Sequence, residues 1–305
     1  MLITPNILPD RFCKMSLFVQ NGDEKLPFKK SVQTKNGVVK EKLLSPVPKP
    51  YYLCQKQPTF GISKLEKGQL LDLDGKIFNR NVTCYCRSDL DWSNFGGYLK
   101  KKFKDISKVN IQDFACSTGD EAYSLALLLT KVYGDSDFKI NASDINGSLI
   151  ERNMKNQESG IEVDGFISYK ILRELAIDSK DTGKYFYPAD LAYTQIRSKI
   201  SNKVNFRKAN ILSEIDKLDG KSPSLILCRN MWPYIDSLQY DSFARKLYEK
   251  TAPGSVVVVG SYDYMGEERF KASDKFPQML IRSGFKPVMF PTGLNMPKDA
   301  LIFEK

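Results

Sequence analysis

Residues 113–124, DFACSTGDEAYS, join an apolar segment to a helix-like run and decide the expected fold. Residues 109–115, VNIQDFA, are typical of a buried strand, and residues 121–133, EAYSLALLLTKVY, are typical of a helix. A strand, a tight turn of small residues and a helix form the cofactor-binding unit of open α/β sheets. Asp120 and Glu121 stand at the helix start, where their charges would repel a triphosphate. The stretch therefore predicts a cofactor site that tolerates carboxylates and is not a phosphate-binding loop.

Strands and helices alternate along the rest of the chain. Candidate strands are residues 109–115, 138–144, 204–210, 224–230, 255–261, 285–290 and 300–305, and helical patterns include 119–133, 147–157 and 236–250. This alternation predicts a mostly parallel sheet with helices on both faces. The short link PTGLNMPKD permits the last two strands to pair antiparallel. We therefore expect an α/β fold with a mostly parallel seven-stranded sheet and an antiparallel C-terminal hairpin. Such a fold would resemble the Rossmann-like layout of S-adenosylmethionine (SAM)-dependent methyltransferases.

The chain divides into segments of different composition. Residues 1–60 contain seven prolines and ten Lys or Arg against four Asp or Glu, so we expect a basic, Pro-rich N-terminal arm. Residues 61–108 are expected to be a helical lead-in, with a helix at 88–106 that begins at a Ser-x-x-Asp cap signal. Residues 109–305 are expected to form the methyltransferase domain, and 158–203 are long enough for an inserted β-hairpin subdomain.

The composition limits the chemistry. The 305 residues include no histidine, which excludes Ser-His-Asp and Cys-His catalysis and any histidine general base. The six cysteines form no CxxC pair, so we expect reduced thiols and no metal site. The formal net charge of +10 leaves nucleic-acid binding open, but the basic residues are dispersed, and a solvated tail is the favoured interpretation.

Hydrophobic patterning bears on localisation. The apolar content of 42% is enough for a globular core, and no apolar run approaches the roughly 18 residues of a membrane span. The start, MLITPNILPDRFCK, has no basic residue before its apolar stretch and contains two prolines, so a signal peptide is not expected. We therefore expect a cytoplasmic protein without membrane insertion, and the sequence makes no prediction of its oligomeric state.

Small residues alternate through the turn that follows the first strand: Ala115, Ser117 and Gly119. Small side chains let the backbone approach a cofactor closely. Asp144 ends the second strand, where a carboxylate commonly accepts the hydroxyls of a ribose. SAM has no phosphate and carries a positive sulfonium, so a pocket lined by carboxylates suits it. Glu121 also fits a capping box with Thr118, which is compatible with a role in the site.

Two further motifs make a family resemblance specific. They are Asn81-Val-Thr83-Cys-Tyr85-Cys-Arg87 and Cys228-Arg229-Asn230-Met-Trp-Pro-Tyr234, the second at the carboxyl end of the fourth strand. With the Ser117-Thr118-Gly119 turn and the Ser143-Asp144-Ile145 strand end, they resemble, in order, four motifs of the CheR-type chemotaxis receptor methyltransferases. The resemblance covers roughly residues 78–265 and implies a divergent member of this SAM-dependent protein-glutamate O-methyltransferase family.

The resemblance also implies roles for individual residues. Arg87 and Tyr234 would act at the reaction centre, and Arg87 would hold the carboxylate of either the substrate or SAM. The residues that would bind the cofactor are Asn81, Thr83, Arg87, Ala115, Ser117, Gly119, Glu121, Asp144, Asn210, Ile211, Arg229 and Asn230. The substrate half departs from the family. Residues 1–60 have no clear counterpart to its helical N-terminal domain, and Ser261-Tyr262-Asp263 stands where the family tends to have Ser-Glu.

The expected function is SAM-dependent O-methylation of a carboxylate, with a glutamate of an unidentified protein as the favoured acceptor. An ionised carboxylate needs no general base, which suits a chain without histidine. Two alternatives stay open: a nucleic-acid or small-molecule methyltransferase, and a non-catalytic scaffold that binds SAM.

Overall fold

The computed structural model describes residues 69–71, 77–79, 83–188, 193–232, 235, 237–264, 275–289 and 301–305. The chain divides into two units, residues 1–64 and 65–305, and every described residue belongs to the second. The expected arm at 1–60 lies outside the described residues, as do Asn81 and Tyr234 of the expected site.

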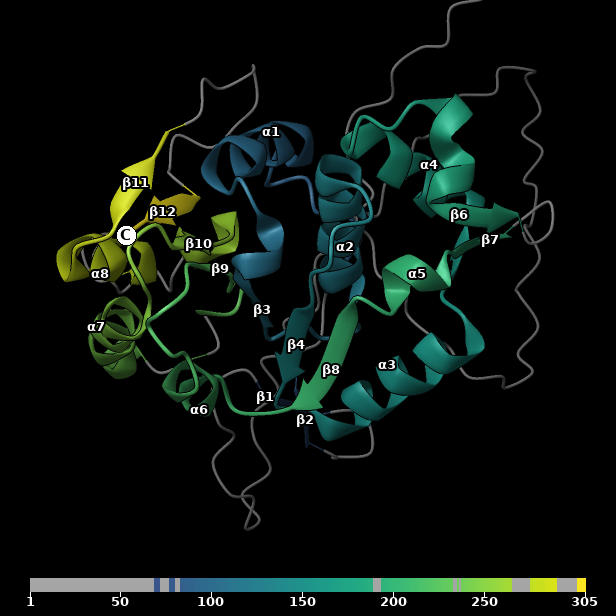
Figure 1. Ribbon diagram of the computed structural model, residues 1–305. Coiled ribbons are helices and arrows are strands. Elements are labelled where there is room, and N and C mark those ends of the chain that lie inside the picture. The colour runs from purple at the N-terminus through teal and green to yellow at the C-terminus, as the bar shows by residue number, and fades with distance from the viewer. Residues whose placement is uncertain are drawn as a thin grey trace, which may run out of the picture. The chain divides into compact units, whose positions relative to one another are not determined.

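A seven-stranded sheet organises the described unit (Figure 1). Its strands, in spatial order, are β11 (Lys286–Val288), β12 (Ile302–Glu304), β10 (Val256–Val258), β9 (Ser224–Leu227), β3 (Asn110–Phe114), β4 (Ile140–Asp144) and β8 (Val204–Lys208). The strands from β10 to β8 pair parallel with one another, and β12 pairs antiparallel with both β10 and β11. The predicted α/β fold, with a mostly parallel sheet and an antiparallel C-terminal pair, is therefore confirmed.

Helices cover both faces of this sheet. They are α1 (Trp92–Lys102), α2 (Asp120–Tyr133), α3 (Gly147–Ser159), α6 (Ile211–Asp216), α7 (Tyr240–Lys250) and α8 (Phe276–Ser283). Successive side chains of a strand point to opposite faces. Leu225 and Leu227 of β9 accordingly belong to the core cluster that includes residues of α1, α2 and α3, whereas Ile226 belongs to the cluster with α6, α7 and α8. Burial on both faces explains why the strands are continuously apolar in sequence.

A small second sheet lies between α3 and β8 in the chain. β5 (Glu162–Asp164), β6 (Phe186–Pro188) and β7 (Tyr193–Ile196) pair antiparallel in the order β5-β7-β6. α4 (Gly165–Glu174) follows β5, and α5 (Ser198–Ser201) follows β7. This sheet occupies the part of 158–203 in which the sequence suggests a β-hairpin. Short 3-10 helices are η1 (Ile106–Lys108), η2 (Ser179–Lys184), η4 (Ser237–Gln239) and η5 (Ser261–Tyr264).

The lead-in at 61–108 differs from the helical segment expected. Before α1, β1 (Gln69–Leu71) pairs antiparallel with β2 (Ile77–Asn79). The dipeptide Asp74-Gly75 stands between the two strands and is a strong sequence signal for a tight hairpin. The lead-in therefore contains a strand pair followed by one helix, and the expectation of a helical segment is wrong for the part before α1.

α1 begins later than its sequence signal suggests. Its N-cap is Asp91, whose carboxylate accepts a backbone N–H of the first turn, and Ser88 lies before the helix. Gly96 and Gly97 do not interrupt it. A Cβ at Gly96 would come 2.8 Å from Leu128 Cδ1 of α2, so this glycine permits the close approach of the two helices.

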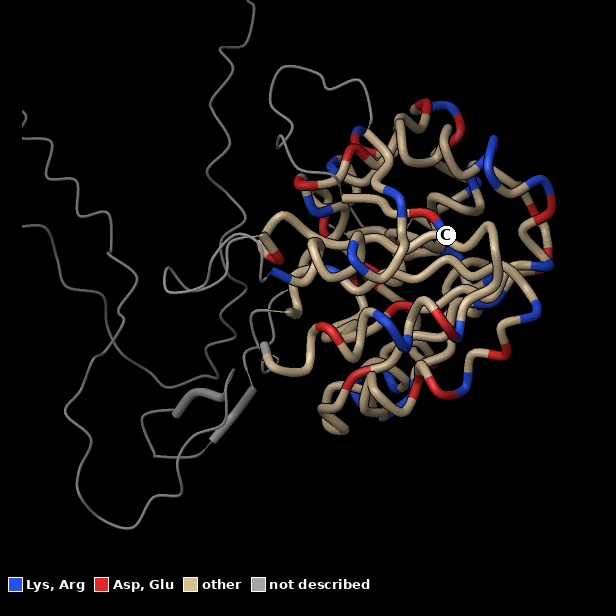
Figure 2. Tube along the Cα trace, turned by 90° about the vertical axis from the view of Figure 1, so that its left-hand side faces the viewer, with Lys and Arg blue, Asp and Glu red and all other residues tan. Residues whose placement is uncertain are grey.

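Charges of both signs are interspersed along the described trace in the view of Figure 2, where Lys and Arg are blue and Asp and Glu are red. No single sign dominates the described trace in that view. Within the described ranges, no helix combines the length and the apolar content needed to cross a membrane.

Candidate active site

The carboxyl ends of the parallel strands bring much of the expected site to one edge of the sheet. Ala115 to Gly119 follow β3, Asp144 ends β4, Asn210 follows β8, and Arg229 with Asn230 follows β9. Parallel strands have their carboxyl ends at the same edge, which is where open α/β sheets bind ligands. Residues 260–263, after β10, join this edge through hydrogen bonds with Asn230.

The turn after β3 has a strained backbone. Ala115, Ser117 and Gly119 have φ angles of 58°, 51° and 85°, in the left-handed region. Glycine adopts this region freely, whereas other residues do so at a cost of roughly 1–2 kcal/mol each. A Cβ at Gly119 would lie 2.9 Å from Phe206 Cζ, so only glycine fits there. Strained non-glycine residues concentrate at binding sites, which supports a functional interpretation of this turn.

Asp144 and Asn153 hold the turn in place. The Ser117 N–H donates to Asp144 Oδ2 at 2.9 Å, and Asn153 Nδ2 donates to Ser117 O at 2.8 Å. The Asn146 N–H donates to the other oxygen, Asp144 Oδ1, at 2.8 Å. Each carboxylate oxygen can accept a second hydrogen bond, so Asp144 keeps acceptor capacity for a ligand.

Asp113, near the end of β3, is a buried carboxyl that is only 1% exposed. Neither of its oxygens has a hydrogen-bond partner among the described residues. Burial, and next the negative charge of Glu121, raises the pKa of Asp113 well above its usual range, while Arg229 opposes this rise. A buried polar group without a partner is costly, and in native proteins such groups are usually satisfied. The edge therefore offers a buried carboxyl whose hydrogen-bonding capacity is unused among the described residues.

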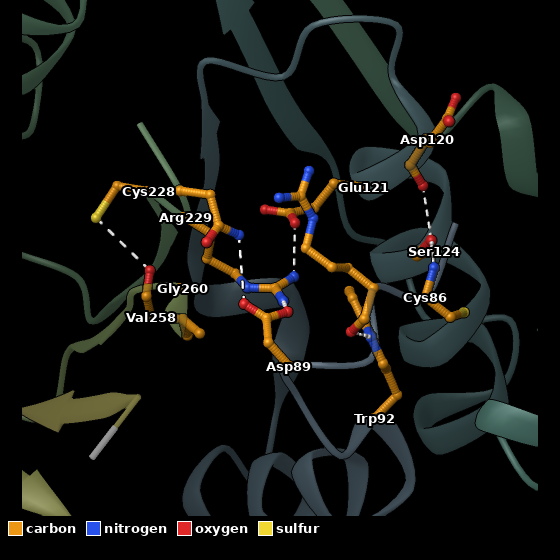
Figure 3. A network of polar contacts seen from close by, with 12 residues as sticks. Cys86, Asp89, Trp92, Asp120, Glu121, Ser124, Cys228, Arg229, Val258 and Gly260 are labelled. Atoms are coloured by element: carbon orange, nitrogen blue, oxygen red, sulfur yellow. Dashed lines mark hydrogen bonds and ion pairs between the residues drawn. The ribbon is translucent and has the colours of Figure 1, made fainter. Parts of the chain in front are cut away.

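Arg229 is a buried cation between two carboxylates (Figure 3). Its Nη1 lies 2.5 Å from Glu121 Oε2 in the first turn of α2, and its Nη2 contacts Asp89 Oδ1. Asp89 Oδ2 also accepts the Ser261 N–H at 2.9 Å and Asn230 Nδ2 at 3.3 Å. Burial raises the pKa of Glu121, although Arg229 opposes it. Burial likewise disfavours ionised Asp89, but Arg229 and the Ser261 N–H hold the pKa of Asp89 below its usual value.

The segment that carries Arg87 docks against the start of α2. The Cys86 N–H donates to Ser124 Oγ at 2.9 Å, and the Ser124 hydroxyl donates to Asp120 O at 2.6 Å (Figure 3). Burial raises the pKa of both Asp120 and Glu121, and the charge of Arg87 opposes both shifts. Arg87 therefore lies within electrostatic range of the first turn of α2.

Asp263 ties the end of β9 to the end of β10. It is 3% exposed and accepts the backbone N–H groups of Gly260, Asn230 and Trp232 at 2.7, 2.8 and 3.1 Å. Burial raises the pKa of Asp263 to about 7, although these three donors favour the ionised form. Asn230 has a φ of 56°, so the bonds to Asp263 help to hold a strained residue at the edge of the site.

Not every expected site residue joins this network. Asn210 is the N-cap of α6, and its side-chain oxygen accepts the Leu212 N–H at 2.9 Å, with Ile211 as the first residue of the helix. Thr83 is half-buried in the segment before Arg87. The roles implied for these three residues stay predictions, as do the cofactor and reaction-centre roles of all the other expected site residues and the meeting of Tyr234 with Arg87.

The capping box expected from Thr118 and Glu121 is wrong. α2 begins at Asp120 with Gly119 as its N-cap, and no side chain accepts a hydrogen bond there. Glu121 pairs with Arg229 instead. Thr118 and Glu121 have the spacing of a capping box. The buried guanidinium of Arg229, which comes from a distant segment, is a stronger partner for the Glu121 carboxylate than a backbone N–H.

Three buried carboxyls were missing from the expected site residues: Asp89, Asp113 and Asp263. Asp113 had a signal, because an acidic residue inside an apolar strand is unusual. Asp263 had one too, because Ser261-Tyr262-Asp263 stands where the family tends to have Ser-Glu. Asp89 had none that could be separated from ordinary surface acids. Across the described ranges, no three Cys, Asp or Glu side chains are grouped so that they could hold a metal ion.

Comparisons with known proteins identify a family for most of the chain. Residues 81–280 match the family described as "CheR methyltransferase, SAM binding domain". A chemotaxis protein methyltransferase of Listeria monocytogenes is 26% identical over 231 residues, 74% of this chain and 80% of that protein. Chemotaxis protein methyltransferase 2 of Vibrio cholerae is 28% identical over 163 residues, 52% of each chain.

Among solved structures, magnesium protoporphyrin IX methyltransferase from Synechocystis with bound SAM aligns over 71% of this chain and 78% of that chain. The identity is 12% and the TM-score is 0.37, which is too low to support a functional inference. The family match carries the assignment instead, because it extends over most of the chain and contains both the strained turn and the Arg229 network. The chain belongs to the CheR methyltransferase family and contains its SAM-binding domain.

Proposed function

We propose that this chain transfers the methyl group of SAM to a carboxylate of a protein, with a glutamate side chain as the acceptor. The observation that carries the proposal is the acidic edge of the sheet, where Asp113, Glu121 and Asp144 are all buried and Asp113 has no partner among the described residues. SAM carries a positive sulfonium and a positive ammonium. Carboxyl oxygens can accept hydrogen bonds from the ammonium, whereas they offer no donor to a phosphate.

The residues present fit SAM in three ways. Asp113 offers a buried carboxyl with unused hydrogen-bonding capacity. Asp144 has acceptor capacity left for ribose hydroxyls. The small side chains of Ala115 and Ser117 leave the backbone of the turn accessible to close approach. When bound, SAM supplies an electrophilic methyl group on its sulfonium.

A carboxylate acceptor fits the catalytic groups that this chain has. A glutamate has a pKa of about 4.3 and is ionised at neutral pH, so no general base is required. The chain has no histidine to serve as one. Methyl transfer then depends mainly on alignment of the nucleophile with the methyl group and sulfur. Arg87 would hold the acceptor by charge-assisted hydrogen bonds, worth roughly 1.5–3 kcal/mol each, and Tyr234 would orient it.

Two observations favour a protein acceptor over a nucleic acid. Both relatives described above are called chemotaxis protein methyltransferases. In addition, Lys and Arg are interspersed with Asp and Glu along the described trace in the view of Figure 2, whereas a nucleic-acid site gathers basic residues on one face.

Methyl-labelled SAM tests the proposal. The protein would be incubated with labelled SAM and a bacterial lysate, and labelled protein would then be treated with base. A carboxyl methyl ester releases its label as volatile methanol, which is the expected result. Base-stable label in protein or in nucleic acid would contradict the proposed acceptor. Tight binding of SAM without any transfer would support the non-catalytic scaffold instead.

A further inference from the structure

Asp89 lies outside the residues expected to form the site, yet it joins three of its segments. In the sequence it stands between Arg87 and α1. Its carboxylate contacts Arg229, which follows β9 (Figure 3), and Ser261, which follows β10. Its Oδ1 accepts Arg229 Nη2. Its Oδ2 accepts the Ser261 N–H at 2.9 Å, Asn230 Nδ2 at 3.3 Å and the Ser261 hydroxyl at 3.4 Å.

The donors around Asp89 require an ionised carboxylate. Both of its oxygens accept hydrogen bonds, so neither is placed to carry a proton. A carboxamide in place of the Asp89 carboxylate would have one acceptor oxygen and one NH2 group. In either orientation its NH2 group would face one of the donors that Asp89 now accepts. The side chain of Asp89 is 10% exposed, which leaves little access for water to replace a lost bond.

Arg229 depends on this carboxylate. Its side chain is 0% exposed, and its two terminal nitrogens are divided between Asp89 and Glu121. Without Asp89, the guanidinium would keep one carboxylate partner and would lose the contact that fixes its orientation. The ion pair between Arg229 and Glu121 would then no longer be held in one orientation.

We propose that Asp89 is a positioning residue of the SAM site: it holds Arg229, and through Arg229 the Glu121 carboxylate, in the orientation that receives the cofactor. The inference rests on the proposed function, because that function places SAM at this edge. A purely structural role would change stability alone. Positioning changes the affinity for the cofactor as well, and it couples Asp89 to Glu121, which it does not contact by any hydrogen bond among the described residues.

The test measures binding of S-adenosylhomocysteine by calorimetry, together with the melting temperature, in the full chain. Asp89→Asn keeps the shape but misplaces a donor, and we expect its affinity to fall by about tenfold or more. Asp89→Ser, which leaves room for a water molecule, serves as the second variant if Asp89→Asn does not fold. The matched control is Asp91→Ala, which removes the N-cap of α1 two residues away. It should lower the melting temperature without changing affinity.

A double-mutant cycle between Asp89→Asn and Glu121→Gln supplies the decisive readout. If both residues act through Arg229, the combined loss of affinity should be smaller than the product of the single losses. Wild-type affinity in a folded Asp89 variant, or losses that simply multiply, would overturn the inference. If the wild-type protein itself binds no S-adenosylhomocysteine, the proposed SAM-dependent function is refuted. If the wild type binds and the Asp89 variants bind equally well, only the positioning role of Asp89 is refuted.

Discussion

Replacing Asp144 by alanine should separate the two tasks of this carboxylate. Within the protein, Asp144 accepts the N–H groups of Ser117 and Asn146 at 2.9 and 2.8 Å. Ser117 is only 6% exposed, so its N–H would be left without water or an acceptor, at a cost of about 1–3 kcal/mol in unfolding free energy. Asn146 is half-buried and can turn to water, so its contribution should be smaller.

The same substitution should weaken SAM binding. Removing a charged acceptor from the ribose hydroxyls costs roughly 1.5–3 kcal/mol, which is about tenfold to a hundredfold in affinity. The released Ser117 also belongs to a turn with strained residues, each costing roughly 1–2 kcal/mol in the left-handed region. Relaxation of that turn would add to the loss, so we expect at least a tenfold effect.

Calorimetric titration with SAM and scanning calorimetry of the free protein would measure the two effects separately. Asn146→Ala is the matched control, because it removes the side-chain cap of α3 while leaving the backbone bond to Asp144 intact. It should cost about 1 kcal/mol in stability and leave SAM affinity unchanged. A folded Asp144→Ala protein with wild-type affinity would remove Asp144 from the site. An unchanged melting temperature would refute its role in holding the turn.

Four further outcomes are expected. Gly119→Ala should abolish SAM binding and destabilise the fold, because its Cβ would meet Phe206 at a φ of 85°; an unchanged melting temperature would contradict this. Because the folded-state pKa of Asp263 is raised to about 7, the folded protein holds a proton that the unfolded chain releases. The unfolding free energy of the protein should therefore decrease as the pH rises from about 4 to 7, as denaturation at several pH values would measure. The decrease should be smaller in the Asp263→Asn variant, which lacks this titrating group. Tyr234→Phe should retain SAM binding, as titration would measure, but lose one or more orders of magnitude in kcat. Arg87→Lys keeps the charge without the bidentate fork and should also be impaired in transfer; full transfer by both would remove them from the reaction centre. Deleting residues 1–60 should leave SAM affinity unchanged, and loss of binding in the truncated protein would show that the arm contributes to the site.

Local patterns in the sequence were enough to predict the sheet and a tight turn of small residues after its first strand. Alternation of apolar strands with helical runs depends on side-chain periodicity, which is a property of neighbouring residues. The three small residues Ala115, Ser117 and Gly119 have left-handed φ angles in the turn. A tight strand-to-helix connection requires small residues at such positions because of its own backbone geometry, whatever the rest of the fold. The Asp74-Gly75 pair carried the same kind of local information, and the strand pair around it was missed only because the signal was overlooked.

Pairing between distant residues was decided by the tertiary structure alone. Arg229 lies 140 residues from Asp89 and 108 from Glu121 in sequence, and only the strand order β9-β3-β4 brings the end of β9 beside the turn after β3. Glu121 satisfied the spacing of a capping box and Asp89 lay beside a cap signal, so local rules gave both residues ordinary roles. Because these carboxylates are buried away from water, they pair with the nearest cation, Arg229. This pairing depends on which side chains are neighbours in space, and residue spacing along the sequence does not predict it.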